Sequence, residues 1–371
     1  MATTDIFDPS DHSPDREMGM LEWHELYDGG SVEAEQKIFA GLADQMLTIQ
    51  EASRRKTGSD QPDRTLHAKM VAGVTNARLI VDEALPAIFR VMHFQPGATL
   101  PVAVRFSNAS AIPQPDFAPD MRGAALKIGL DGDDVHDLLM TSYPVSHARD
   151  ARQFVEFAVI AQGPRETFVE RLVASFGEDE AKRMMDNVQE ASRPCPSLAT
   201  QRFWSRGAIL WGQMPVRFDL RPVAQNVPSA SAGEAPDFLR AELASRLASG
   251  DVLFRLALQP FVSEKETPIE DASVQWKEDV SAPVEIATLV ISQRLLDGEE
   301  GKKQAGVVAS MAFNPWNAPA SFRPLGNLNR VRGLVYGMSA ARWQRGRPAK
   351  VVVDGIDTPG RMDEDGPRLG D

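Results

Sequence analysis

Two groups of strand-like segments, separated by a helical stretch, constrain the fold of this chain most. The first group falls between His67 and Tyr143 and reads MVAGVTNARLIV, LPVAVRFS, GAALKIGL and HDLLMTSY. The second group is VRFDLRP, DVLFRLALQPFV and VEIATLVISQ. Runs of this length and β-branched content are typical of strands, and Asp131-Gly132 is a hairpin signal between the last two strands of the first group. These groups fit a closed antiparallel barrel, which leaves no free sheet edge, although the pattern alone does not distinguish a barrel from a sandwich.

Helical periodicity marks the segments around these strands. Apolar residues recur at helical spacing from Ser31 to Arg55, and Gly58 is expected to end that helix. Residues 148–192 and the segment from about Leu325 to Trp343 are also predicted to be helical. The expected organisation is an N-terminal arm and helix (1–60), a barrel (61–345) with a helical insert (about 148–200), and a C-terminal tail (346–371).

Composition excludes several classes of protein. A length of 371 residues with 43% hydrophobic residues is ample for a sizeable core. The formal charge of −12 argues against nucleic acid or an anionic membrane as a partner, because both attract basic surfaces. No apolar run approaches the ~18 residues of a transmembrane helix, and no targeting segment is visible, so the cytoplasm is the expected location. Cys195 is the only cysteine, which rules out an intrachain disulfide.

Arg332 and Tyr336 are the first candidate functional pair. Residues four apart share one face of a helix, so the guanidinium of Arg332 can lie beside the phenol oxygen of Tyr336. A fixed positive charge favours the phenolate, which is an anionic ligand for iron. Taken alone, such a pair is more often a packed tyrosine beside a solvated arginine.

Further motifs give the pair a context. They are RTLHAK at 64–69, VRFS at 104–107, DMRG at 120–123 and FNP at 313–315, followed by Arg332 and Tyr336. In order and spacing they resemble the heme pocket of the catalase superfamily, over about residues 60–160 and 200–340. The length most resembles the small catalase-related heme peroxidases. This resemblance implies an α+β protein in which an antiparallel barrel of about eight strands, surrounded by helices, buries heme b.

The resemblance also implies roles for individual residues. His67 is expected to be the distal acid–base and Ser107 its hydrogen-bond partner, while Tyr336 would be the iron ligand. An imidazole suits proton transfer because its ordinary pKa lies near ~6.5. The other cofactor-binding residues implied are Arg64 and Arg105 for the heme propionates, Phe154 near the heme plane, and Arg332 beside the ligand.

One position departs from the family pattern. Catalases carry an asparagine on the distal side, and the matching run here, Met140–Asp150, places Ser142 there. A shift of one residue would place Thr141 or Tyr143 instead, and all three carry hydroxyls. His147 occupies a position that is aromatic in the family, and a polar surface or channel residue is the simpler interpretation of it. Ser142 is therefore predicted to be the third catalytic residue, with weak catalase activity as the consequence.

Three functions remain open at this point. The first is a heme peroxidase that reduces hydrogen peroxide or organic hydroperoxides with electrons from a reductant. The second is a heme isomerase or dehydratase of fatty-acid hydroperoxides, and a simple catalase is a variant of the first. The third is a non-enzymatic heme-binding or heme-free barrel, which would require the placing of His67 and Tyr336 to be coincidental. A homo-oligomer is compatible with all of them.

Overall fold

The computed structural model describes residues 22–132, 134–224 and 233–344. Most of the expected N-terminal arm and the expected tail at 346–371 lie outside these residues. Within the described part, no helix is both long and apolar enough to cross a membrane.

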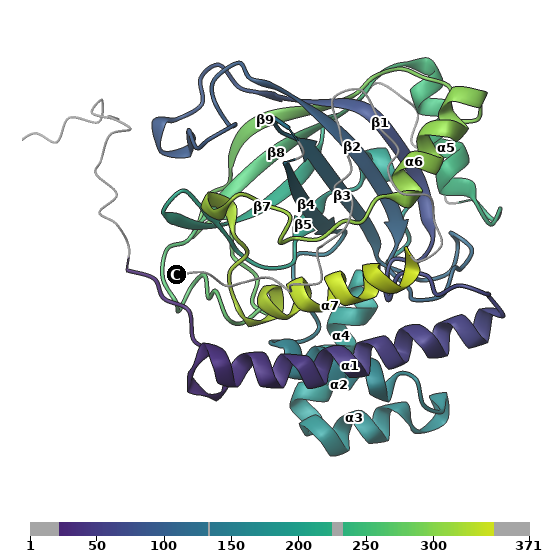
Figure 1. Cartoon of the computed structure of the whole chain (residues 1–371), viewed down its shortest axis with the longest axis vertical. Coiled ribbons are helices and arrows are strands. Elements are labelled where there is room, and N and C mark those ends of the chain that lie inside the picture. The colour runs from purple at the N-terminus through teal and green to yellow at the C-terminus, as the bar shows by residue number, and fades with distance from the viewer. Residues whose placement is uncertain (1–21, 133, 225–232, 345–371) are drawn as a thin grey trace, which may run out of the picture.

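Eight antiparallel strands form a closed barrel (Figure 1). Their order is β5-β4-β3-β2-β1-β9-β8-β7, and the pairing of β5 with β7 closes the ring. A ninth strand, β6, pairs with β7. The strands are β1 (Met70–Val81), β2 (Thr99–Asn108), β3 (Arg122–Gly129), β4 (Val135–Thr141), β5 (Phe203–Ser205), β6 (Ile209–Trp211), β7 (Met214–Pro222), β8 (Val252–Pro260) and β9 (Val284–Ile291). The barrel expected from the sequence is thereby confirmed.

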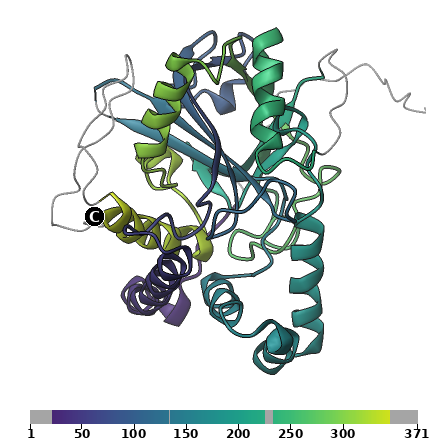
Figure 2. The ribbon, with the colours of Figure 1, turned by 90° about the vertical axis from the view of Figure 1, so that its right-hand side faces the viewer.

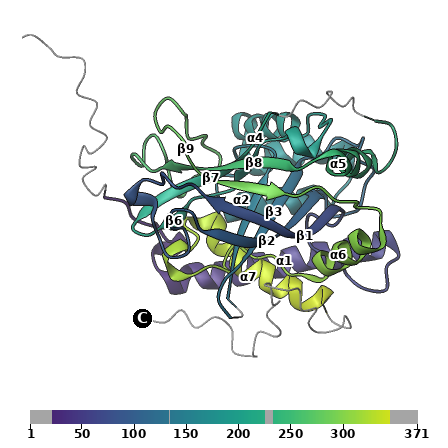
Figure 3. The same ribbon diagram turned by 90° about the horizontal axis from the view of Figure 1, so that it is seen from above.

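Seven α-helices surround the barrel in the described residues. In Figure 1, α7 lies below the barrel with α1 directly beneath it, and Figure 2 shows α5 and α6 at the opposite end from α1 to α4. Figure 3 shows α6 beside β1, which it contacts. The helices are α1 (Val32–Thr57), α2 (Ala151–Ile160), α3 (Phe168–Phe176), α4 (Glu178–Ala191), α5 (Phe238–Ser249), α6 (Glu299–Ser310) and α7 (Asn327–Trp343).

Local sequence explains the bounds of α1. The side chain of Ser31 accepts a hydrogen bond from the backbone N–H of Ala34 and so caps the first turn. Gly58 ends the helix with a φ of 66°, a left-handed conformation that glycine adopts without strain. Between these caps, the apolar face of α1 packs with α2 and α7 in one cluster that includes Met46 and Val335. Helix α1 therefore supports α7, the last of the described helices.

The barrel interior is the main hydrophobic core. Its strands are buried on nearly every residue because helices and loops cover the outside as well. Fully buried side chains from strands far apart in sequence meet there, among them Leu79, Phe106, Leu126 and Phe254. At ~25 cal/mol per Å² of apolar surface, each of these contributes roughly 1.5–3 kcal/mol to folding. This packing gives the strand ends, where the polar motifs lie, a rigid support.

Candidate active site

His67 lies just before β1 and is held in an unusual conformation. Its φ is 56°, which is uncommon for a residue other than glycine, and its backbone N–H donates to the carbonyl of Ala109 at 2.9 Å. The Nδ1 atom of its ring lies 3.0 Å from the hydroxyl oxygen of Ser107 on β2. The two residues predicted to act together on the distal side are thus in hydrogen-bond contact.

Gly123 on β3 leaves the space that the ring of His67 fills. A Cβ atom at this position would lie 2.6 Å from Nδ1 of His67 and 2.7 Å from Oγ of Ser107. Any side chain at this position would therefore collide with the imidazole. The glycine of the DMRG motif is required by the close approach of His67.

Strand register decides which residue of β4 shares this face. Ser107 pairs with Gly123, and Gly123 pairs with Thr141. Directly paired residues of antiparallel strands point to the same side of the sheet, so Thr141 belongs to the row that carries Ser107. Ser142 comes after the strand, and its hydroxyl accepts the backbone N–H of Arg122 at 2.8 Å. Thr141 is 5% exposed and is the hydroxyl that register brings toward His67.

The electrostatic environment of His67 is strongly positive. Burial lowers the pKa of His67 to about 3, and four guanidinium groups add to the effect, those of Arg105, Arg206, Arg332 and Arg64. Of these four arginines, Arg105 contacts His67 directly, because its Nη2 donates to the backbone carbonyl of His67 at 2.8 Å. The imidazole of His67 is therefore neutral at physiological pH and can accept a proton.

Much of the positive charge in this region is not balanced by carboxylates of the described residues. Among the described residues, no carboxylate forms an ion pair with Arg105, Arg206 or Arg332, and Asp63 acts on Arg105 only from beyond ion-pair distance. The Nε atom of Arg105 is buried without a hydrogen-bond partner. Burial lowers the pKa of Arg105 to about 10, which shows how unfavourable its desolvated charge is. An anionic ligand would relieve this cost.

Helix α7 brings the second candidate pair to the same region. The Nη2 atom of Arg332 lies 3.4 Å from the phenol oxygen of Tyr336, and its guanidinium carbon lies 5.3 Å from the centre of the phenol ring. Arg332 lies close enough to His67 to lower its pKa, and Tyr336 lies close enough to Arg105 and Arg206 to act on their pKa values. The two predicted halves of the site therefore lie close enough to interact electrostatically.

Apolar side chains complete this region. Leu66, beside His67, packs with Phe154 of α2 and Val335 of α7 in the cluster that also holds α1. The ring of His147 lies 5.0 Å from that of Phe154, and its Nε2 is buried without a partner. Burial is the main reason that the pKa of His147 is lowered to about 3. The imidazole of His147 is therefore neutral and largely enclosed, which argues against the surface residue and agrees with the channel residue of the simpler interpretation.

Arg64 is fixed at the edge of the region. Its Nη2 donates to the carbonyl of Met311 at 2.5 Å, and its guanidinium lies 4.1 Å from the ring centre of Trp343. These contacts hold Arg64 between α7 and the segment that follows α6.

Arg206 is a site residue that the sequence did not indicate. It follows β5 and lines a small pocket with Asn329 and Arg332. Its guanidinium donates to the carbonyl of Val145 and contacts the sulfur of Met121 at 2.7 Å. Burial, together with the charge of Arg332, lowers its pKa to about 10. No local pattern marks an arginine between two three-residue strands, so only the closed barrel reveals it.

These features fit heme. The macrocycle is apolar and planar, its two propionates are anionic, and its iron takes an oxygen or nitrogen ligand. The described residues supply an apolar wall, the guanidinium groups of Arg105, Arg206 and Arg332 without carboxylate ion pairs among these residues, a phenol and an imidazole. Tyr336 would hold the iron, Arg64 and Arg105 would hold propionates, and Phe154 would pack against the ring.

Comparison with known proteins agrees with this geometry. The sequence model of the family described as Catalase matches residues 31–172. A curated protein named catalase-related peroxidase, from Mycolicibacterium paratuberculosis, is 29% identical over 301 residues, which are 77% of this chain and 90% of that protein.

Solved structures of catalases share the fold. A fungal catalase superposes with a TM-score of 0.59 at 18% identity, covering 78% of this chain and 61% of that one. Catalase A from Saccharomyces cerevisiae gives a TM-score of 0.55 at 15% identity, covering 78% and 63%. The chain thus spans about three fifths of the length of these two catalases. In its barrel and in its sequence matches, the chain is thus similar to proteins of the catalase superfamily, among them a catalase-related peroxidase.

Proposed function

We propose that this protein is a heme b peroxidase that reduces hydrogen peroxide, organic hydroperoxides or both at the expense of a reductant, with weak catalase activity. The observation that carries the proposal is that the contacts His67–Ser107 and Arg332–Tyr336 lie in one region with the buried guanidinium groups of Arg105 and Arg206. When bound, heme supplies an iron centre at which a peroxide bond is cleaved and oxidising equivalents are stored. The remaining steps depend on groups of the chain.

His67 would move the proton. Its neutral imidazole accepts a proton from the bound peroxide and returns it to the departing oxygen atom, which then leaves as water or an alcohol. The contact with Ser107 and the space at Gly123 hold the ring in one orientation for this transfer. Propionates bound at Arg64 and Arg105 would offset the positive field, which brings the pKa of His67 back toward its ordinary value.

Tyr336 would hold the iron as phenolate. The guanidinium of Arg332 stabilises the negative charge on its oxygen, and the metal charge acts in the same direction. The partly buried side chains of Phe154 and Leu66 would offer the macrocycle an apolar contact surface.

The test is a pair of tyrosine variants. Tyr336→Phe should bind heme poorly or with an altered absorption spectrum, because the phenyl ring offers no ligand. Tyr27→Phe is the matched control, since Tyr27 stacks on Arg330 outside this region. A Tyr336→Phe protein with the normal heme content and spectrum would refute the ligand assignment.

A third variant and a product assay test the reaction. His67→Ala should keep its heme and lose about 10²–10⁴-fold in peroxide turnover, the usual contribution of an acid–base group. With a lipid hydroperoxide, a peroxidase yields the alcohol and consumes two electrons from the reductant for each alcohol formed. Products that form without consumption of reductant would instead establish the isomerase or dehydratase function.

A further inference from the structure

Arg332 is held by a neutral side chain, Asn329. The Nη1 atom of Arg332 donates to Oδ1 of Asn329 at 2.8 Å, which leaves Nη2 to face the oxygen of Tyr336. A guanidinium is a planar fork, so fixing one of its nitrogens fixes the direction of the other. The orientation of Arg332 toward Tyr336 therefore depends on where Asn329 is placed.

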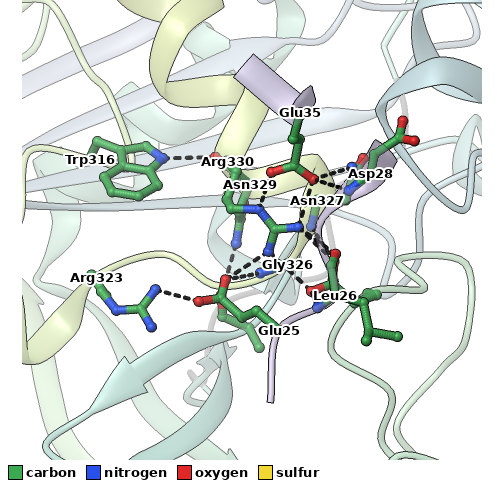
Figure 4. Close-up of polar contacts among 12 residues, drawn as sticks. Glu25, Leu26, Asp28, Glu35, Trp316, Arg323, Gly326, Asn327, Asn329 and Arg330 are labelled. Atoms are coloured by element: carbon green, nitrogen blue, oxygen red, sulfur yellow. Dashed lines mark hydrogen bonds and ion pairs between the residues drawn. The ribbon is translucent and has the colours of Figure 1, made fainter. Parts of the chain in front are cut away.

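Asn329 is itself immobilised by contacts on every polar atom of its side chain. Its Nδ2 donates to the carbonyl of Ala208 at 2.9 Å, and its backbone carbonyl accepts the indole N–H of Trp316 at 2.8 Å (Figure 4). The residue is 3% exposed. A Cβ at Gly207 would lie 2.6 Å from its Nδ2, so glycine is needed there for the amide to approach. Asn329 thus ties Arg332 to the segment between β5 and β6.

Trp316 is anchored in turn to the barrel. Asn314, two residues earlier, accepts the backbone N–H of Trp316 and donates to the carbonyl of Gly333. The backbone N–H of Asn314 donates to Asp137 on β4, which forms a buried ion pair with Lys127 at 2.6 Å. The support of Asn329 therefore reaches through this loop into two strands.

Arg330, also on α7, differs from Arg332 because its partners are carboxylates. Arg330 contacts three carboxylates at 2.6–3.0 Å: those of Glu25 and Glu35, which Figure 4 labels, and that of Glu270. These carboxylates offset its charge completely. Arg332, two residues on, has an amide partner and no carboxylate partner within the part of the chain that the structure describes. The helix thus separates a neutralised arginine from one whose charge remains available.

We propose that Asn329 is a positioning residue that aims Arg332 at Tyr336 while leaving its positive charge uncompensated, and so raises the reduction potential of the heme iron. A carboxylate at 329 could also accept from Arg332, but it would cancel the charge and could not donate to the carbonyl of Ala208. The amide gives orientation without neutralisation, because its oxygen is a dipolar and not an ionic acceptor. Groups that orient an iron ligand commonly tune the metal in this way. The inference depends on Tyr336 being the iron ligand, as proposed above.

Two variants of the heme-loaded protein separate charge from orientation. Asn329→Asp keeps an acceptor for Arg332 and adds a negative charge, so the ferric–ferrous equilibrium should shift at least tenfold toward ferric. Such a shift is about 59 mV for a one-electron couple. Asn329→Ser shortens the side chain, so that its hydroxyl no longer reaches Arg332, and adds no charge. It should broaden or split the ferric electron paramagnetic resonance signal, with a smaller change of potential.

The control is Gln344→Glu, which adds the same charge at the exposed end of α7. It should leave the potential and the resonance signal unchanged. A role in folding alone would lower the melting temperature of both Asn329 variants and leave the potential of the heme-loaded fraction at the normal value.

The outcomes are distinguishable from a failure of the proposed function. A normal heme spectrum in Tyr336→Phe would refute Tyr336 as the iron ligand, and with it the basis for the role of Asn329. An altered Tyr336→Phe spectrum with a normal potential and resonance signal in Asn329→Ser overturns the role of Asn329 alone, and so does a normal potential in Asn329→Asp. If Asn329→Asp does not accumulate as folded protein, the serine variant decides.

Discussion

Replacing Gly123 with alanine should displace the ring of His67 without touching any heme contact. The added Cβ would lie 2.6 Å from Nδ1 of the ring and 2.7 Å from Oγ of Ser107. Carbon and nitrogen atoms in ordinary contact are at least about 3.4 Å apart, so the ring must move by roughly 0.8 Å or more. Neither neighbour can absorb this shift unaided, because both belong to the 3.0 Å contact between His67 and Ser107.

The expected loss follows from that displacement. A misplacement of about 1 Å can cost ~10²-fold in rate, so peroxide turnover should fall by about one to two orders of magnitude. Overpacking costs about 1–3 kcal/mol, which lowers the melting temperature but leaves a folded protein. Heme content should stay normal, since Arg105 and Tyr336 keep their places.

The assay combines stopped-flow peroxide decay with heme absorbance and thermal melting. Gly306→Ala is the matched control, because a Cβ there meets nothing within 4 Å. Gly306 lies within α6, where alanine should stabilise the helix by ~0.5–1 kcal/mol and leave turnover unchanged. A Gly123→Ala protein with normal turnover and a normal pH profile would show that the ring of His67 does not need this position.

Three further predictions concern the same region. Arg105→Leu should weaken heme binding in a titration of the apoprotein more than it slows peroxide cleavage per bound heme; equal affinity would contradict a propionate contact. Thr141→Asn should raise oxygen release from hydrogen peroxide more than Ser142→Asn does, because register places Thr141 on the row of Ser107; the reverse order would support Ser142. The apoprotein should lose stability as the pH falls from about 6.5 toward 3, since buried histidines with lowered pKa values, among them His67 and His147, bind protons more readily when unfolded. A urea midpoint that does not fall between pH 7 and pH 5 would refute this.

The sequence predicted the parts of this fold that follow a regular period. The strands from Met70 to Thr141, their hairpin at Asp131-Gly132 and the helix capped by Ser31 each carry a local signal that packing does not override. The strands β5 and β6 have three residues each, too few for alternation to show. Their place is set by pairing with β7, which is a long-range contact.

The site could be predicted to the extent that motifs carried it. His67 and Ser107 are 40 residues apart, and their hydrogen bond follows the expected pairing. The sequence favoured Ser142 because a proline-containing run aligns it with the asparagine of catalases. The side of the sheet on which a residue lies depends instead on strand register, and a shift of one residue moves its side chain to the other side. Arg206 and Asn329 have no motif at all, because their importance arises from neighbours that only the closed barrel and α7 bring together.

The closure of the barrel has a mechanical consequence. Strand β5 is joined to β4 by two residue pairs and to β7 by two more, whereas β2 and β3 share seven. Strand β5 is thus the most weakly paired part of the barrel wall. Fluctuations that open the barrel should begin at β5, because the fewest backbone hydrogen bonds must break there. The backbone amides of Phe203–Ser205 should exchange with solvent deuterium before those of β2. Arg206 follows β5 directly, so this weakly paired strand carries at its end a buried guanidinium that lies near the charge of Arg332.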